Sequence, residues 1–133
     1  DVGARDGIGW PWDAVQREML NVILVEPDPI EAKVLEDQKQ GRVLPYALWD
    51  KETELTLNIN NSPGTSSVFE ANMPFLLQFE DAQRFQVKEK ITIKTKTIDG
   101  LVLSNEIDSV DFVKMDVQGG ELAILQGGEK FFK

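Results

Sequence analysis

The chain has 133 residues, of which 41% are hydrophobic and 28% charged, and it carries a net charge of −9. These values are typical of one globular domain with one core, and no apolar run is long enough to cross a bilayer. The excess of acids repels a phosphate backbone, so nucleic acid is not an expected partner. The chain contains neither cysteine nor histidine. Disulfides and the commonest metal ligand are therefore excluded, no metal site is expected, and a reducing cytoplasm is the expected location.

A glycine-rich turn opens the chain, with Asp1 followed by glycines at positions 3, 7 and 9. Its spacing does not match the dinucleotide fingerprint G-x-G-x-x-G, because Trp12 stands at the third glycine position counted from Gly7. A Walker phosphate loop is also excluded, since no G-K-[ST] tripeptide occurs. Asp1 suits a ligand ammonium group better than a phosphate. The next segment, Trp10 to Leu20, is predicted to form a helix that packs on a sheet through Trp12, Val15 and Met19.

The second strand and its helix are predicted with clear boundaries. Val22 to Val25 is a continuous apolar run, typical of a strand buried on both faces. Glu26 follows at the carboxyl end of this strand, where a carboxylate can accept hydrogens from the hydroxyls of an adenosine ribose. Asp28 and Glu31 predict a capping box around Pro29, and Gly41 predicts the helix end. The expected buried stripe of this helix consists of Ile30, Val34 and Leu35.

The middle of the chain predicts an antiparallel insertion. Arg42 to Leu48 is expected to be a third strand, and Glu54 to Asn60 alternates as a half-buried strand does. Residues 60–67 predict a loop, and residues 68–85 carry no regular pattern, so we expect a flap there. Val87 to Ile98 alternates aliphatic residues with lysines, which predicts an edge strand with a solvated lysine face.

The last third predicts a short helix from Thr97, a buried strand over Val110 to Val117, and a helix over residues 119–127 whose Leu122 and Leu125 face the sheet. Lys114 and Asp116 lie two residues apart in the predicted strand and therefore on one face. Two interpretations stay open: a Lys–Asp pair that only caps the strand, or Asp116 at a ligand site. Glu121 is expected to face the same crevice from the helix.

Strands that alternate with helices predict an α/β fold: a Rossmann-like, doubly wound, mostly parallel sheet with an antiparallel insertion. We expect residues 1–133 to form a single domain, and an incomplete one in which the later strands of the sheet are absent. Asp1 for an amine and Glu26 for a ribose together favour S-adenosylmethionine as the cofactor.

Several motifs in this order resemble FkbM-family methyltransferases. They are D-V-G-A-x-x-G from Asp1, V-E-P-x-P from Val25, A-L-x-D from Ala47, the Ser66-Ser67 pair, T-I-D from Thr97, V-D-F-V-K-M-D-V-x-G-x-E from Val110, and L-x-G-G from Leu125. The resemblance implies S-adenosylmethionine-dependent methyl transfer to a hydroxyl of a sugar, glycan or natural product. It also implies a cofactor site in which Asp1, Gly3, Ala4 and Gly7 line the methionine portion, Glu26 and Pro27 hold and flank the ribose, and Ala47 and Leu48 lie near the adenine.

The resemblance places Asp116 beside the reacting methyl group. An alcohol acceptor must lose its proton, and without histidine Asp116 is the first candidate base and Glu121 the second. The chain departs from the family pattern at Arg5, where Asn is common, at Gln118, where Glu is common, and at Gly120, which replaces Ala. Two alternatives remain: a nicotinamide-dependent oxidoreductase, which the failed glycine fingerprint opposes, and a catalytically silent Rossmann-like module. The oligomeric state stays open.

Overall fold

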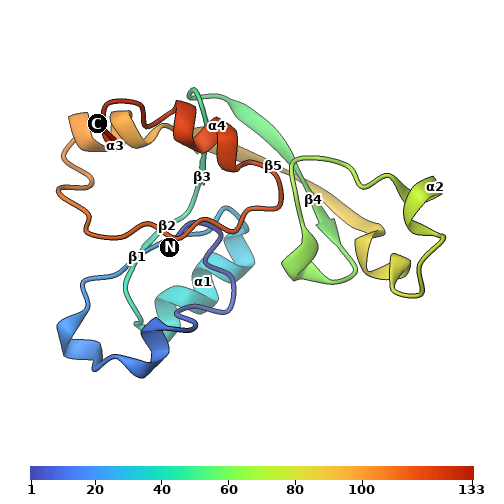
Figure 1. The fold of residues 1–133 in the computed structure, drawn as a ribbon, viewed down its shortest axis with the longest axis horizontal. Helices are drawn as coiled ribbons and strands as arrows, with labels where there is room; N and C mark the ends of the chain where they lie inside the picture. Colours follow the sequence, from blue (N-terminus) through green and yellow to red (C-terminus); the bar gives the residue numbers. More distant parts are fainter.

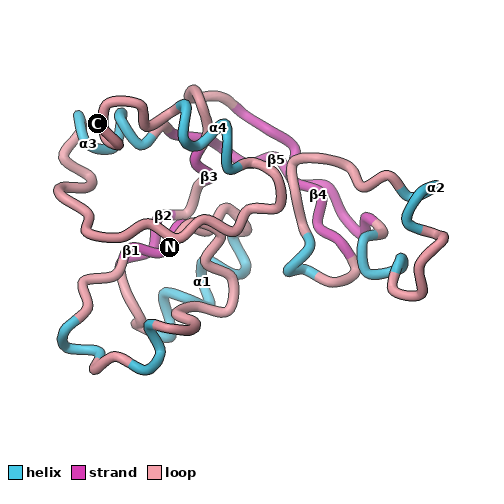
Figure 2. The backbone as a smooth tube through the Cα atoms, viewed as in Figure 1, coloured by secondary structure: helices cyan, strands magenta, loops and turns pink.

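The computed structural model describes residues 1–133 as a mixed α/β chain with two small sheets (Figure 1). The strands are β1 (Ile23–Val25), β2 (Arg42–Leu44), β3 (Ala47–Leu48), β4 (Glu54–Asn60) and β5 (Val87–Lys96). The α-helices are α1 (Pro29–Gln38), α2 (Met73–Leu76), α3 (Ile98–Leu103) and α4 (Glu121–Gln126). Short 3-10 turns cover Trp12–Ala14, Arg17–Met19, Pro63–Thr65 and Ala82–Phe85. Loops connect these elements over long stretches, as Figure 2 shows, and no helix is long and apolar enough to cross a membrane.

Four parallel segments lie side by side at the centre of the molecule. β1 pairs with β2 in parallel, and Val2 forms parallel bridges to Val25 on one side and to Met115 on the other. The spatial order is therefore β2, β1, the segment at Val2 and the segment at Met115. The segments at Val2 and Met115 take part only in isolated bridges. The parallel pairing expected from the sequence is therefore present over a shorter length than in a regular ladder.

The second sheet forms an arm that reaches away from this centre (Figure 1). Its strand order is β3-β5-β4, with β5 parallel to β3 and antiparallel to β4. The antiparallel pair confirms the predicted strand over Glu54–Asn60. The segment between β4 and β5 holds α2 at the far end of the arm, where Phe75, Leu77 and Phe79 are exposed.

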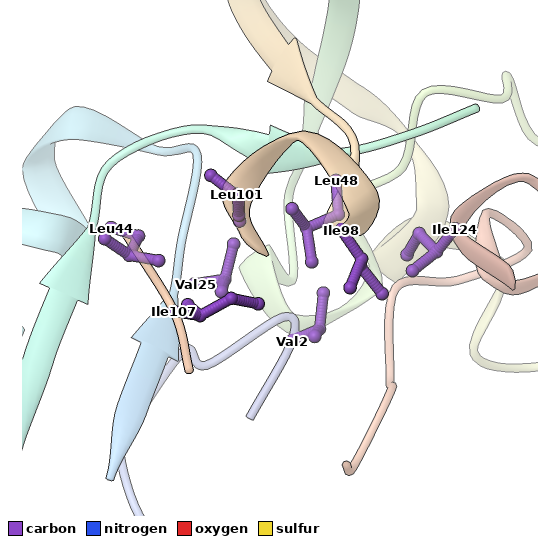
Figure 3. Close-up of a cluster of buried hydrophobic side chains, with 8 residues drawn as sticks. All are labelled: Val2, Val25, Leu44, Leu48, Ile98, Leu101, Ile107 and Ile124. Carbon is purple, nitrogen blue, oxygen red and sulfur yellow. The ribbon is translucent and has the colours of Figure 1, made fainter. Parts of the chain in front are cut away.

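Apolar side chains cover both faces of the parallel segments. On one face, Leu24 of β1 packs with Ala4 and with Leu35 of α1. On the other face, a larger cluster draws on the opening segment, β1, β2, β3, α3 and α4 (Figure 3); its members are Val2, Val25, Leu44, Leu48, Ile98, Leu101, Ile107 and Ile124. Successive strand residues point to opposite faces, so Leu24 and Val25 serve different clusters. The result is a layer of parallel segments between α1 and the pair α3 and α4.

The predicted helix over residues 10–20 is wrong: the structure has only two 3-10 turns there. Of the residues expected to pack on the sheet, Met19 is exposed, and the ring of Trp12 packs edge-on against Phe112 with centroids 4.9 Å apart. The segment is held by side chains instead of by helical backbone bonds. Arg17 donates to the carbonyl oxygens of Leu20 and Gln40, and the Gln40 amide oxygen accepts from Ile8 N at 2.7 Å. These tertiary contacts override a weak helical pattern.

Three strand predictions also need correction. The run over Arg42–Leu48 divides into β2 and β3, which belong to different sheets, because Pro45 has no N–H to continue a ladder. β5 is the middle strand of its sheet, not an edge strand. Residues 110–117 form no strand: their backbone pairing is limited to Val2, whose N donates to Lys114 O and whose O accepts from Asp116 N.

The remaining helix predictions hold for position but not for every face. Asp28 caps α1 as predicted, its Oδ1 accepting from Ile30 N at 3.0 Å. The capping box is absent, because Asp28 N donates to Glu26 Oε1 instead of to Glu31. The expected stripe is wrong at Ile30 and Val34, which are exposed, while Ala32 is buried with Leu35.

α3 begins after Thr97 as predicted, and its Thr97 side chain accepts from Gly100 N. In α4 the predicted inward face is wrong. Leu122 is 68% exposed whereas Ile124 is 1% exposed. The two glycines that flank this helix, Gly120 and Gly127, lie close to Trp49. This contact orients the helix so that the face that carries Ile124 points inward.

Candidate functional site

Three predicted site residues meet at the carboxyl end of the parallel segments. Gly3, Glu26 and Asp116 each directly follow a residue of the parallel pairing, namely Val2, Val25 and Met115. Backbone bonds keep the segments in register: Gly3 N donates to Val25 O at 3.0 Å, and Asp116 N donates to Val2 O at 3.0 Å. All three residues line one cleft. Ligands of parallel α/β sheets bind at this edge.

Gly3 is the residue that lets two of these segments come together. Its φ of +76° lies in the left-handed region, and an added Cβ would lie 2.2 Å from the backbone oxygen of Asp116. No other residue type fits this combination of conformation and close approach. The turn after the first segment is thus fixed against the loop that carries Asp116.

Glu26 places a buried carboxylate at the cleft. The residue is 4% exposed, its Oε1 accepts from Asp28 N at 2.9 Å, and its Oε2 has no hydrogen bond within the protein. Burial raises the pKa of Glu26, while the hydrogen bond from Asp28 N and the charge of Arg5 act in the opposite direction. A buried carboxylate with one free oxygen is suited to accept hydrogen bonds from ligand hydroxyls.

Arg5 neutralises a group of acids around Glu26. Its guanidinium contacts Asp28 Oδ2 at 2.6 Å and Glu31 Oε2 at 3.1 Å. The other oxygen of Glu31 accepts from Asp6 N at 3.2 Å. Arg5 thereby ties the glycine-rich turn to the start of α1, and it lines the cleft.

The loop over residues 116–121 is tightly held, although Asp116 itself is exposed. Gln118 and Gly119 both have positive φ, of 58° and 104°. Glu121 accepts from Val117 N at 3.1 Å and from Gly119 N at 3.0 Å. Backbone N–H groups, its own among them, lower the pKa of Glu121. Glu121 therefore shapes this loop and is a weaker proton acceptor than an ordinary glutamate.

The arm supplies the opposite wall of the cleft. Its lining residues are Leu57, Pro63, Gly64, Ser66, Val68 and Ile93. Asn58 and Asn60 of β4 are buried beneath the loop that follows the strand. Asn58 Nδ2 donates to Ser67 O at 3.0 Å, and Asn60 Nδ2 donates to Thr65 O at 2.8 Å. The wall is thus anchored within the arm.

Trp49 closes the cleft between the two halves. Its ring lies beside Phe69, with centroids 6.2 Å apart, and against Gly120, where an added Cβ would lie 2.9 Å from the indole. The glycine at position 120 makes room for the ring.

The structure brings together most, but not all, of the predicted site residues. Those that line the cleft are Gly3, Glu26, Pro27, Ala47, Leu48 and Asp116. Asp1, Ala4, Gly7 and Glu121 do not line it. The carboxylate of Asp1 binds Lys114 Nζ at 3.0 Å, so the Lys–Asp pair considered from the sequence forms with Asp1 and not with Asp116.

Ala4 and Gly7 support the cleft from behind. Ala4 is fully buried against Leu24 and Leu35, and Gly7, at a φ of +82°, packs on Gln40. Arg5 and Trp49 are cleft residues that the sequence did not assign to the cofactor. The departure from Asn at position 5 was the only available signal for Arg5.

A sequence model described as the methyltransferase FkbM domain matches residues 1–133. The match spans the whole chain, so the protein belongs to the FkbM methyltransferase family. No curated protein and no solved structure matches the chain. Membership confirms the family that the motifs indicated, and it implies a methyltransferase enzyme.

Proposed function

We propose that this protein is an S-adenosylmethionine-dependent methyltransferase that acts on a hydroxyl group of a small molecule, sugar or glycan. The observation that carries the proposal is the meeting of Gly3, Glu26 and Asp116 at one edge of the parallel segments. The spatial order of these segments, third, second, first and fourth in the chain, supports a Rossmann-like sheet. The family supports methyl transfer, and the geometry supports a nucleoside at this edge.

The residues present fit such a cofactor. The free oxygen of Glu26 provides an acceptor for ribose hydroxyls, and Pro27 flanks it. Ala47 and Leu48 provide apolar surface for the adenine. Arg5 keeps the surrounding acids neutralised, so that an ionised Glu26 is compatible with its burial. Asp1 does not line the cleft, but its carboxylate binds Nζ of Lys114, which does. Asp1 would therefore influence the methionine portion only through Lys114.

When bound, the cofactor supplies a methyl group on a positively charged sulfur. Asp116 would accept the proton that the acceptor hydroxyl releases during methyl transfer. Glu121 holds the loop that carries Asp116 through its bonds to Val117 N and Gly119 N. Close alignment of the two reactants in the cleft provides much of the rate.

Calorimetric titration with S-adenosylhomocysteine tests the proposal. The parent should bind it, and Glu26→Gln should weaken binding roughly tenfold or more, the worth of a charge-assisted hydrogen bond. Glu129→Gln, which removes an exposed carboxylate of the same type, should bind as the parent does. Burial raises the pKa of Glu26, so the neutral amide removes an unfavourable charge and this variant should keep its fold.

Two results would contradict the proposal. A folded parent that does not bind S-adenosylhomocysteine removes the cofactor assignment, and the silent module then becomes the better explanation. A parent that binds NAD in preference to S-adenosylhomocysteine favours the oxidoreductase. Equal affinity of the Glu26→Gln and Glu129→Gln variants would place the nucleoside away from Glu26.

A further inference from the structure

We propose that Ser67 and Gln118 are positioning residues that fix the carboxylate of Asp116 at the cleft. The inference rests on the proposed function, in which Asp116 accepts the proton of the acceptor hydroxyl. Gln118 Nε2 donates to Asp116 Oδ1 at 3.1 Å. An amide at this position donates a hydrogen bond to the carboxylate, whereas the glutamate common in the family would present a second negative charge to it.

The side chain of Gln118 is exposed, so its own bond to Asp116 is not strong enough to set a geometry. The backbone supplies the missing constraint. Gln118 has a φ of +58°, a left-handed conformation that residues other than glycine adopt only with support from their surroundings. This support must come from a contact that holds the peptide in place.

Ser67 makes that contact. The residue is 7% exposed, and its Oγ donates to the carbonyl oxygen of Gln118 at 2.8 Å. The same Oγ accepts from Phe69 N at 3.0 Å, which leaves the hydroxyl hydrogen directed at Gln118. Ser67 is itself paired with Asn58 of β4 through backbone bonds in both directions.

These contacts form a continuous connection from β4 through Ser67 and Gln118 to Asp116. The arm thereby determines where the reactive carboxylate of the other half of the cleft points. The hydrogen-bond partners of Asp116 are Gln118, which donates to its carboxylate, and Val2 O, which accepts from its N. Ser67 acts through Gln118, because it makes no hydrogen bond with Asp116 itself.

NMR of the side-chain amide of Gln118 tests the inference in the full chain without any ligand. Gln118→Met identifies the signal by deleting it. We expect the signal to shift in Asp116→Asn, because the carboxylate that accepts from Gln118 Nε2 is then replaced by a neutral amide. Ser67→Ala should also shift the signal. The exposed Gln126, with no side-chain bond of its own, provides an internal control whose signal should not shift in either variant.

Ser66→Ala is the matched control for Ser67→Ala. Ser66 lies next in the chain and its Oγ accepts only from Asn60 N, at 3.2 Å, so its removal should leave the Gln118 signal in place. A Gln118 signal that is the same in Asp116→Asn as in the parent overturns the proposal. So does an equal effect of the two serine variants.

Titration with S-adenosylhomocysteine separates this inference from the proposed function. Ser67→Ala and Gln118→Met should bind it within about twofold of the parent, since neither residue contacts Glu26. If the parent does not bind, the proposed function fails while the NMR result still stands or falls independently. If Gln118→Met binds more than about tenfold more weakly, Gln118 belongs to the cofactor site and its assignment to Asp116 is wrong.

Discussion

Removal of Arg5 is the sharpest test of how the cleft tolerates its acids. Arg5→Met deletes the cation that contacts Asp28 and Glu31, and it keeps most of the apolar stem. The side chains of Arg5, Asp28 and Glu31 are 20%, 12% and 14% exposed. Loss of one partner in a fully buried pair costs about 3–5 kcal/mol, and partial exposure reduces this to roughly 2–3 kcal/mol here.

The loss of stability should depend on pH. Burial raises the pKa of Glu26, and the charge of Arg5 opposes that rise. An acid whose pKa is higher in the folded chain binds more protons when folded, so its contribution to stability falls as pH rises above its unfolded value. Without Arg5 the pKa of Glu26 in the folded chain rises further, so the pH interval over which Glu26 destabilises the fold extends to higher pH. The deficit of Arg5→Met should therefore be larger at about pH 8 than at about pH 5.

Urea unfolding at both pH values measures this difference. Lys33→Met is the matched control, because Lys33 contacts Asp37 at 2.9 Å with both side chains about two thirds exposed, and such exposed pairs contribute little to stability. If Arg5→Met unfolds at the same urea concentration as Lys33→Met, or if its deficit shrinks as pH rises, the argument that Arg5 neutralises the acids around Glu26 is refuted.

Two further substitutions test the packing around the site. Gly3→Ala introduces a Cβ 2.2 Å from Asp116 O at a φ of +76° and should destabilise the fold by more than about 2 kcal/mol; Gly9→Ala, with nothing within 4 Å, should not, and similar melting temperatures for the two variants would contradict the close approach. Ile124→Ala should cost about 2–4 kcal/mol while Leu122→Ala stays within about 0.5 kcal/mol, since these residues are 1% and 68% exposed. If Leu122→Ala destabilised the protein to urea more than Ile124→Ala does, the inward face of α4 would be the one expected from the sequence.

Local patterns predicted the elements whose signals are complete within a few residues. Asp28 before Pro29 defines the start of α1, Thr97 defines the start of α3, and alternation defines β4. The patterns failed where a distant partner decides the structure. The segment over residues 10–20 depends on Gln40, which bonds to Ile8 and Arg17, and the inward face of α4 depends on Trp49. No local signal reports either fact.

The residues of the site also fall into those that local patterns predict and those whose position depends on distant contacts. Glu26 and Asp116 were predicted because each follows an apolar run, and both line the cleft. The ion pair between Lys114 and Asp1 joins opposite ends of the chain, so sequence spacing could not distinguish it from a pair with Asp116. Trp49 occupies the unspecified position of the A-L-x-D motif, which assigns it no role. Its place in the cleft depends on Gly120 and Gly127, which lie far along the chain and lack the atoms that would displace it.

The buried asparagines beneath the arm loop have an evolutionary consequence. Asn58 and Asn60 hold residues 65 and 67 from within their own hairpin, whereas Gly3, Glu26 and Asp116 are held by the parallel segments. Pro63 and Gly64, at the tip of the loop, take part in neither of these two sets of hydrogen bonds. Mutations at this tip can therefore change the shape of one side of the cleft while the opposite side stays intact.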